Sequence, residues 1–472
     1  MSITPLLRPA VNSDIAQILD TPSRLHEAFV TYKRPLSISM IKSAINVVAE
    51  FESLFHELNI EGRVYIAHKA TSDRYAIRSL QPYARIDVAS VWELHSAQRA
   101  GFSMDRIIAT GPKADYFLEA LLKAGVTIAI DSTEELLRIQ TLLQSESSRR
   151  KECTILLRLS RSILNMPSVT RGSRFGLDRA AVDRVTSLLA SDDRFNLRGV
   201  SFHLDTQSIQ ERRYASQVAI DELLRLQSIG FCQATVLDVG GGFGTDYGVT
   251  AADKDHFAIS LQKAIKSNAS QRLTWQGYSY GMSKNEGSLT GRIQGIELAH
   301  ISTGADRLRE ILLGKGTDGV TIASQLRDNL IELWIEPGSA VLSGSSVLAM
   351  QIIEVKDVDG ALVIVVDGHR NQVCFDGSEA PCDPLLISSA ISDKCSAYIA
   401  GHLCVESDLL TYRKVQFDVT PRSGDILLWT HTGAYRSHFS VSQAIGHPLP
   451  KKLAYIEQTT GGYVLEENDN DL

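Results

Sequence analysis

The 472-residue sequence has few cysteines, little net charge and no long apolar run. Its six cysteines include no Cys-x-x-Cys pair, which argues against a disulfide scaffold and a structural zinc site. A net charge of −7 gives no basic surface for nucleic acid or an anionic membrane. The run from Ala361 to Val366 is far shorter than the roughly 18 residues of a membrane helix. With an N-terminus that lacks a signal-peptide core, these absences predict a cytoplasmic protein without a nucleic-acid or membrane partner.

Two familiar phosphate-binding fingerprints are also missing. The glycine triplet at 240–242 does not continue as Gly-x-Gly-x-x-Gly, because the last position falls on Thr245 or Tyr247. The pair Gly314-Lys315 is followed by glycine rather than serine or threonine. The sequence therefore gives little support for a dinucleotide-binding fold or a P-loop.

What the sequence does contain is a regular alternation of short apolar runs and segments of helical periodicity, beginning near residue 63. Eight runs are candidate strands, at 63–67, 85–89, 106–109, 126–130, 154–159, 199–203, 235–239 and 330–336. Helical patterns lie between them, for example at 91–100, 114–124, 133–144 and 214–229. Eight such units over about 275 residues predict an α/β fold, a (β/α)8 barrel of the TIM type, rather than an open sheet.

The residue pattern changes after Ser339, where strand-like segments are joined by Asp/Gly turns and helical patterns become few. This pattern predicts a mostly antiparallel C-terminal β domain. We expect the barrel domain to span 45–340, with an insertion at about 271–300. Residues 1–44 and 341–472 would form the β-rich domain, with a strand at 34–39 pairing into it.

The residues at the ends of the predicted barrel strands carry the chemistry, since reactive groups in such barrels come from the C-terminal strand ends. Taken singly, Lys69 is typical of a surface charge and His203 of a packed histidine. As a set, however, a lysine can hold an aldehyde cofactor as a Schiff base, and a glycine turn can bring backbone N–H groups to a phosphate. A carboxylate such as Glu336 can keep a pyridine nitrogen protonated. Together these residues predict a pyridoxal 5′-phosphate site.

Several segments resemble the motifs of one family, the fold type III pyridoxal-phosphate decarboxylases, over about residues 33–455. This group includes the ornithine, diaminopimelate and biosynthetic arginine decarboxylases. The segments are Ala67-His68-Lys69-Ala70, Asp87-Val88-Ala89-Ser90 with Glu93, Ser173-Arg174-Phe175-Gly176, His203-Leu204-Asp205-Thr206-Gln207, Leu237-Asp238-Val239-Gly240-Gly241-Gly242 and Glu336-Pro337-Gly338.

The resemblance implies a role for each of these positions. Lys69 would anchor the cofactor, His203 would stack on its ring, and Glu336 would contact the pyridine nitrogen. The residues implied to contact the phosphate or the rest of the cofactor are Thr206, Gly240, Gly241, Gly242, Gly338, Asp87 and Arg158.

Two further motifs lie in the β domain. Gly401-His402-Leu403-Cys404 with Asp408 resembles the family segment whose cysteine acts across a dimer interface. Gly433-Ala434-Tyr435 resembles the segment whose tyrosine contacts the phosphate. The resemblance therefore implies an obligate homodimer with shared sites, in which Cys404 is a catalytic proton donor.

The sequence also departs from the family pattern. Ser339 replaces an arginine, Val405 an acidic residue, His402 a proline and Asp205 a glycine. These changes predict a divergent member whose substrate does not end in a simple cation. Ser339, Val405 and Asp408 are the candidate substrate contacts.

The resemblance implies decarboxylation of an amino acid or an amino-acid derivative, with Lys69, His203 and Cys404 as the catalytic residues. A racemase or epimerase of the same fold is an alternative, but the racemase pattern pairs the ring nitrogen with arginine rather than with a residue such as Glu336. A non-catalytic dimeric homologue is a second alternative. The presence of the lysine, the cysteine and the glycine turn disfavours it.

Overall fold

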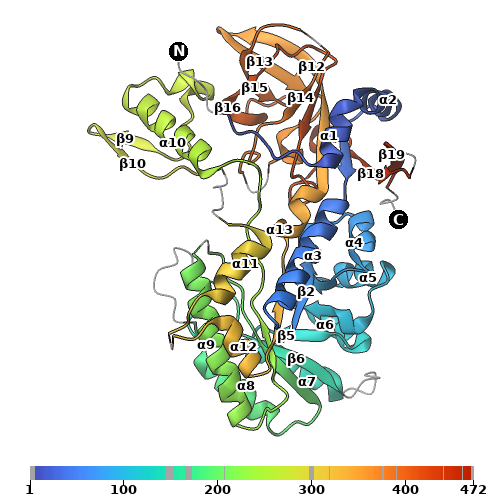
Figure 1. Cartoon of the computed structure of the whole chain (residues 1–472), viewed down its shortest axis with the longest axis vertical. Coiled ribbons are helices and arrows are strands. Elements are labelled where there is room, and N and C mark those ends of the chain that lie inside the picture. Colours follow the sequence, from blue (N-terminus) through green and yellow to red (C-terminus); the bar gives the residue numbers. More distant parts are fainter. Residues whose placement is uncertain are drawn as a thin grey trace. The chain divides into compact units, whose positions relative to one another are not determined.

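The structure is a computed structural model, and it describes residues 6–144, 152–164, 173–206, 208–296, 302–317, 319–374, 377–389, 391–439, 441–459 and 461–468. The chain divides into two units (Figure 1). The barrel unit comprises Ser43–Gly244 and Ser302–Val341. The sheet unit comprises Met1–Lys42, Thr245–Ile301 and Leu342–Leu472.

Eight parallel strands close into a barrel in the barrel unit. They are β2 (Gly62–Ala67), β3 (Arg85–Val88), β4 (Ile107–Ala109), β5 (Thr127–Ile130), β6 (Cys153–Arg158), β7 (Phe195–Ser201), β8 (Val236–Asp238) and β11 (Glu332–Ile335). Each strand overlaps one of the eight apolar runs. The barrel closes where β11 pairs in parallel with both β8 and β2. The predicted TIM-type barrel is therefore confirmed.

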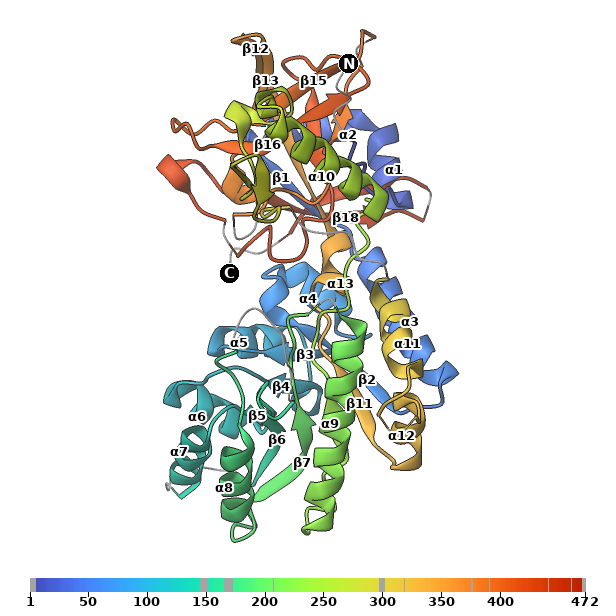
Figure 2. The same ribbon diagram turned by 90° about the vertical axis from the view of Figure 1, so that its left-hand side faces the viewer.

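Helices surround these strands, and successive helices from α4 to α8 contact one another (Figure 2). They are α3 (Lys42–Glu57), α4 (Arg74–Leu80), α5 (Val91–Arg99), α6 (Asp115–Ala124), α7 (Thr133–Gln144), α8 (Arg179–Leu189), α9 (Ile209–Ser228), α11 (Gly304–Leu313), α12 (Ile322–Asp328) and the short α13 (Ser339–Leu342). Several begin at capping side chains, which satisfy backbone N–H groups of the first turn. Ser90 accepts from Glu93 N, for example, and Ser208 accepts from Glu211 N.

An apolar layer fills the barrel interior. It consists of Tyr65, Ile108, Ala129, Leu156, Val236 and Trp334, one from each of six strands. Because side chains alternate along a strand, the positions two residues further on face the same interior. Those positions are Ala67, Thr110, Asp131, Arg158, Asp238 and Glu336. All of these positions except Ala67 carry polar side chains, so an apolar plug lies beneath a mostly polar layer at the C-terminal strand ends.

The sheet unit contains a mostly antiparallel nine-stranded sheet, as predicted. Its strands are β1 (Leu36–Ser39), β12 (Ser346–Val358), β13 (Ala361–Val366), β14 (Leu385–Ile387), β15 (Cys395–Ala400), β16 (Leu409–Phe417), β17 (Ile426–Trp429), β18 (Lys451–Glu457) and β19 (Tyr463–Glu467). The strand expected at 34–39 is present as β1, which pairs antiparallel with β12 and parallel with β18. Helices α1 (Ser13–Asp20) and α2 (Pro22–Tyr32) pack apolar residues into the same core.

Residues 245–301 belong to the sheet unit, although the sequence-based boundaries place them in the barrel domain. Helix α10 (Ala251–Lys266) buries Phe257 and Leu261 against Tyr280 and Met282, next to a hairpin of β9 (Ser283–Asn285) and β10 (Ser288–Thr290). Tyr412 of β16 packs against the same cluster. This shared core explains the grouping. The last part of the expected insertion, 297–300, lies outside the described residues.

Within the described ranges, no helix combines the length and the apolar character needed to cross a membrane.

Candidate active site

A ring of polar side chains lies at the C-terminal ends of the barrel strands. It includes three buried carboxyl groups, from Asp87, Asp238 and Glu336, and one hydroxyl-to-carboxylate hydrogen bond of 2.7 Å from Thr110 to Asp87. Burial raises the pKa of Asp87 to about 7, and nearby Glu336 adds to this shift. Since an isolated buried carboxylate is costly, such a group tends to hold its proton.

Glu336 and Asp238 form the centre of this ring. Burial raises the pKa of Glu336 well above its usual range, and the charge of Asp238 raises it further. Burial also raises the pKa of Asp238 to about 7, while the N–H of Gly240 bonds to its Oδ1 at 2.8 Å and opposes the shift. The buried Oδ2 of Asp238 receives no N–H or hydroxyl of the described residues. A hydrogen bond between the two carboxyl groups raises the pKa of Glu336 and lowers that of Asp238, which favours the proton on Glu336.

Lys69 lies in the same electrostatic environment. It follows β2 in the short helix η1 (His68–Ala70), and its side chain is half-buried. Its positive charge lowers the pKa values of Asp87, Glu93 and Glu336, partly offsetting the effect of burial. The predicted lysine and the predicted ring carboxylate are therefore brought together at one end of the barrel.

The glycine turn after β8 contacts His203, which follows β7. The N–H of Gly241 donates to Nδ1 of His203 at 3.2 Å. A Cβ at Gly240, where φ is +67°, would lie only 2.7 Å from the same Nδ1. Burial, with the charge of Lys69 second, lowers the pKa of His203 to about 3. The imidazole is therefore neutral and accepts through Nδ1.

Thr206, expected near a phosphate, is hydrogen-bonded locally. Its hydroxyl donates to the carboxylate of Glu211, and its Oγ1 accepts from Ser208 N at 3.1 Å. These bonds stabilise the start of α9. The neighbouring Gln207 of the same motif lies outside the described residues.

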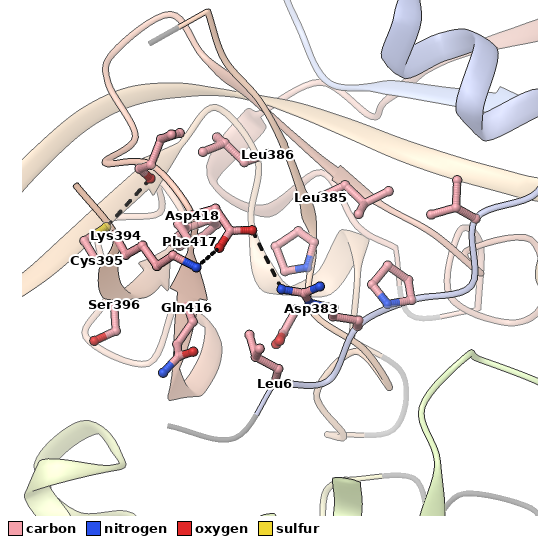
Figure 3. Close-up of a pocket in the computed structure, with 15 residues that line it drawn as sticks. Leu6, Asp383, Leu385, Leu386, Lys394, Cys395, Ser396, Gln416, Phe417 and Asp418 are labelled. Atoms are coloured by element: carbon pink, nitrogen blue, oxygen red, sulfur yellow. Dashed lines mark hydrogen bonds and ion pairs between the residues drawn. The ribbon is translucent and has the colours of Figure 1, made fainter. Parts of the chain in front are cut away.

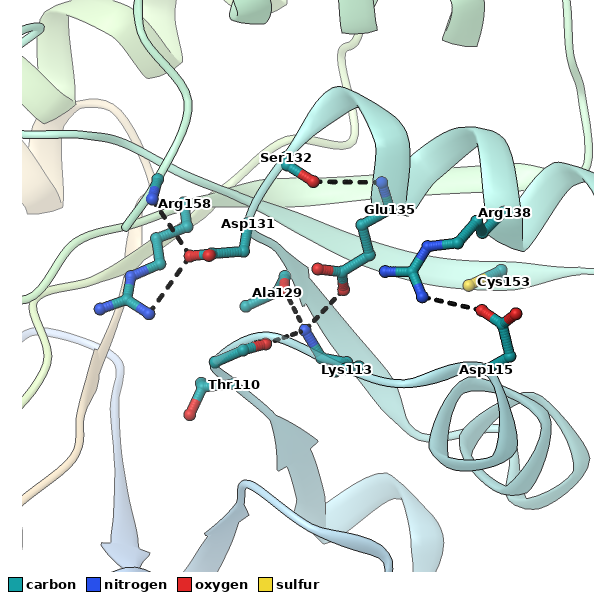
Figure 4. Close-up of polar contacts among 12 residues, drawn as sticks. Thr110, Lys113, Asp115, Ala129, Asp131, Ser132, Glu135, Arg138, Cys153 and Arg158 are labelled. Atoms are coloured by element: carbon teal, nitrogen blue, oxygen red, sulfur yellow. Dashed lines mark hydrogen bonds and ion pairs between the residues drawn. The ribbon is translucent and has the colours of Figure 1, made fainter. Parts of the chain in front are cut away.

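Arg158 at the end of β6 connects the barrel to the Ser173–Gly176 motif. Its Nη1 lies 3.4 Å from Oδ1 of Asp131, which also accepts from Gly176 N at 3.1 Å (Figure 4). The guanidinium lies over the ring of Phe175, 4.5 Å from its centroid. Asp131 and Arg158 thus fix the loop that carries this motif.

A buried ion pair beneath Asp131 was missed by the sequence analysis. Nζ of Lys113 donates to Glu135, Ala129 O and Gly111 O, each at 2.7 Å (Figure 4). All three donor positions of the ammonium are used, so the pair supports the strand ends rather than a ligand. A lysine just after one strand and a glutamate in the first turn of a helix were the available signals.

The remaining predicted barrel residues lie at the start of α13. Gly338 is buried and accepts from Val341 N at 3.1 Å through its carbonyl. Ser339 is the first residue of α13 and is half-buried.

The other predicted residues lie in the sheet unit. Cys404 and Val405 are exposed on a turn that Asp408 organises, since its carboxylate accepts from Leu403 N and Arg370 N at 2.9 Å each. Tyr435 is half-buried, with φ at +62°. The candidate residues thus form two sets, one in each unit.

Three histidines near the Cys404 turn were not singled out for any shared role. The ring of His402 stacks on that of His447 with centroids 3.8 Å apart, and the ring of His369 lies 6.3 Å from His402. Burial and the neighbouring imidazoles lower the pKa of His402 to about 4. In the part of the chain that the structure describes, no group of His, Cys, Asp and Glu has the arrangement of a metal site.

A hollow of about 850 Å³ also lies in the sheet unit, but its walls include none of the predicted residues (Figure 3). Its charged groups pair with one another: Nζ of Lys394 lies 2.8 Å from Asp418, and Nη2 of Arg8 lies 3.7 Å from it. We therefore place the candidate site at the end of the barrel.

Comparison with known proteins gives a family for the barrel. Residues 45–275 match the family described as "Pyridoxal-dependent decarboxylase, pyridoxal binding domain". An uncharacterised protein of Sinorhizobium fredii is 27% identical over 436 residues, covering 90% of this chain and 89% of its own. The L-glutamyl-[BtrI acyl-carrier protein] decarboxylase of Niallia circulans is 23% identical over 467 residues, covering 94% of this chain and 92% of its own.

Solved structures of this fold cover nearly the whole chain. The diaminopimelate decarboxylase of Helicobacter pylori, complexed with L-lysine, superposes with a TM-score of 0.68 at 19% identity, covering 94% of this chain and 98% of its own. The arginine decarboxylase of Paramecium bursaria Chlorella virus, bound to agmatine, gives a TM-score of 0.66 at 18% identity, covering 92% and 99%. Together with the matched pyridoxal-binding domain and the shared motifs, these similarities show that the chain is a distant member of the fold type III pyridoxal-phosphate-dependent decarboxylase family.

Proposed function

We propose that this protein decarboxylates an amino acid or an amino-acid derivative, with pyridoxal 5′-phosphate held at Lys69. The observation that carries the proposal is the burial of the Glu336 and Asp238 carboxyl groups together at the barrel end that also holds Lys69, which raises the pKa of both. A carboxyl group in such a site can pass its proton to a pyridine nitrogen, and the carboxylate that results keeps that nitrogen protonated.

The residues at the barrel end fit this cofactor. Glu336 supplies the acidic group, and the neutral ring of His203 supplies an apolar face for stacking. The glycine turn packs closely against the end of β11. A Cβ at Gly241 would lie only 2.5 Å from the carbonyl oxygen of Glu336, so a larger residue would not fit there. When bound, the cofactor supplies an aldehyde that binds an amine and a ring that takes up the electron pair left by carbon dioxide.

The chain's own groups would act around that chemistry. Lys69 would hold the aldehyde of the cofactor through its amine and would give it up to the amine of a substrate. Glu336 holds a proton at the ring nitrogen. We propose that the thiol of Cys404, from the partner subunit of a homodimer, donates a proton to the substrate carbon after the carboxylate has left.

The proposed substrate has a distal end that is not a simple cation. Val405 and Ser339 stand where the family pattern has an acid and an arginine, and a relative across most of the chain acts on a glutamyl group attached to a carrier protein. We expect carbon dioxide release to be faster from glutamyl compounds than from ornithine or diaminopimelate. Measured preference for a diamine substrate would contradict this part of the proposal.

The anchoring role of Lys69 can be tested directly. We expect borohydride to fix the cofactor covalently to the wild-type chain and not to Lys69→Ala, because Lys69 is the lysine next to the Glu336 and Asp87 carboxyl groups. Mass spectrometry of the reduced protein is the measurement. Lys284→Ala, at an exposed hairpin in the sheet unit, is the matched control and should behave like wild type. Covalent fixation to Lys69→Ala would show that another lysine is the anchor.

A further inference from the structure

Arg212, in the first turn of α9, is a buried cation beneath the glycine turn. Only 2% of the residue is exposed, and its Nη2 donates to Leu204 O at 2.9 Å and to Gly241 O at 2.5 Å. Among the described residues, the hydrogen-bond partners of this guanidinium are these two carbonyl oxygens and not a carboxylate. Burial and the charge of Arg307 lower the pKa of Arg212 to about 10, so it remains charged at neutral pH. The charge of Asp205 opposes this shift, but the guanidinium itself bonds to carbonyl oxygens, so the site holds a positive charge outside any close ion pair.

The same contact fixes the direction of one peptide group. The peptide between Gly241 and Gly242 is trans, so its N–H points opposite to the carbonyl that Arg212 binds. Gly242 is exposed, and its φ of +88° suits glycine. A Cβ at this position would lie 2.2 Å from Nη2 of Arg212. The N–H of Gly242 therefore points away from Arg212, on an exposed segment of the turn.

The other two amides of the triplet are already used. Gly240 N donates to Asp238, and Gly241 N donates to His203. No described residue accepts a hydrogen bond from Gly242 N. Of the three glycine amides, the one that Arg212 orients is thus the one left for a ligand.

We propose that Arg212 is a positioning residue for a phosphate group bound at the Gly240–Gly242 turn. It acts through the carbonyl of Gly241 to direct the N–H of Gly242, and its charge favours a dianion over a neutral ligand at this turn. The assignment of that phosphate to pyridoxal 5′-phosphate rests on the proposed function. The preference of the turn for an anion does not rest on the proposed function, because it follows from the charge of Arg212.

Ligand binding without catalysis tests the proposal. In the full chain carrying Lys69→Ala, dissociation constants are measured for pyridoxal 5′-phosphate, pyridoxal and inorganic phosphate. Adding Arg212→Met should weaken binding of both phosphate ligands by about ten-fold or more, because a charge-assisted interaction is lost. Binding of pyridoxal should change by less than about two-fold, since it lacks the dianion.

Two further variants separate this role from simple packing. Arg213→Met removes a neighbouring guanidinium that donates to the Glu310 carbonyl, and it should leave the phosphate-to-pyridoxal affinity ratio unchanged. Arg212→Lys keeps the charge on a shorter side chain with a single nitrogen, so it should lower the ratio by less than Met does. It also serves as the deciding variant where Arg212→Met does not fold.

The phosphorus resonance of the bound ligand supplies an independent readout. Loss of the Arg212 charge should raise the second pKa of the bound phosphate, an effect that a packing role would not produce. An unchanged affinity ratio in the folded Arg212 variants overturns the inference. A parent chain that binds phosphate but neither aldehyde overturns the proposed function alone, and one that binds none of the three overturns both.

Discussion

At the scale of single residues, the barrel end is notable for carboxyl groups whose pKa values are raised. Asp87 and Asp238 have pKa values raised to about 7, and that of Glu336 is higher still, in each case mainly because of burial. Lys69 and Arg158 lie close enough to oppose these shifts without cancelling them. The acidic character of the site therefore depends on depth in the barrel as much as on residue type.

Glu336→Gln should keep bound cofactor and lose about 10²–10³-fold in decarboxylation rate, because a neutral amide cannot hold a ring nitrogen protonated. Turnover and the absorbance of the bound cofactor are measured on the same sample. Glu332→Gln is the matched control, since Glu332 begins the same strand and pairs with Arg63 at 2.7 Å. A Glu336 variant with turnover close to that of the control would rule out the proton-holding role.

At the scale of secondary-structure elements, one buried arginine joins three distant segments of the sheet unit. Arg413 of β16 pairs with Asp383 and lies 3.3 Å from Glu379. Glu379 in turn accepts from the hydroxyl of Tyr280 at 2.6 Å, and Asp383 accepts from Leu7 N at 2.8 Å. The segment around Tyr280 is thus connected to β16 by charge as well as by apolar packing.

Arg413→Met should lower the free energy of unfolding by about 3–5 kcal/mol, because it leaves two carboxylates buried without their partner. Urea denaturation followed by circular dichroism measures this change. Lys394→Met breaks an exposed ion pair with Asp418 and should leave the midpoint unchanged. Equal stability of the two variants would show that the buried network does not hold these segments together.

At the scale of the whole molecule, the candidate residues are divided between the two units. Lys69 and Glu336 lie in the barrel unit, whereas Cys404 and Tyr435 lie in the sheet unit. We propose that a homodimer brings one set from each subunit into a shared site. The family pattern, in which the cysteine acts across an interface, supports this arrangement.

Subunit mixing tests the shared site. Lys69→Ala and Cys404→Ala should each be inactive or nearly so, and after exchange they should regain up to about one quarter of wild-type activity. Random exchange makes half the dimers mixed, and each mixed dimer has one intact site. Activity is assayed as carbon dioxide release, with exchange verified by differently tagged subunits. Complete exchange without any recovered activity would contradict the dimer proposal.

The sequence predicted the barrel well because its signal is local. Each strand is a short apolar run followed by a helical pattern, and the functional candidates stand at the strand ends, as Lys69 and Glu336 do. Arg212 could not be predicted in this way. It lies in a helix without a motif, and its importance depends on two carbonyl oxygens, of Leu204 and Gly241, that a sequence does not place.

The sequence also did not predict that residues 245–301 group with the sheet unit. The periodicity of Phe257 and Leu261 predicts a helix with one apolar face, but it does not say which partner covers that face. Tyr280, Met282 and Tyr412 do so in the structure. Tertiary packing, rather than local propensity, decides the boundary.

The raised pKa values of Glu336 and Asp238 have a consequence for how a ligand would bind. A basic group that binds at this end of the barrel would take its proton from these carboxyl groups rather than from bulk water. The apolar plug of Tyr65 and Trp334 beneath the ring would shield that transfer from the opposite end of the barrel.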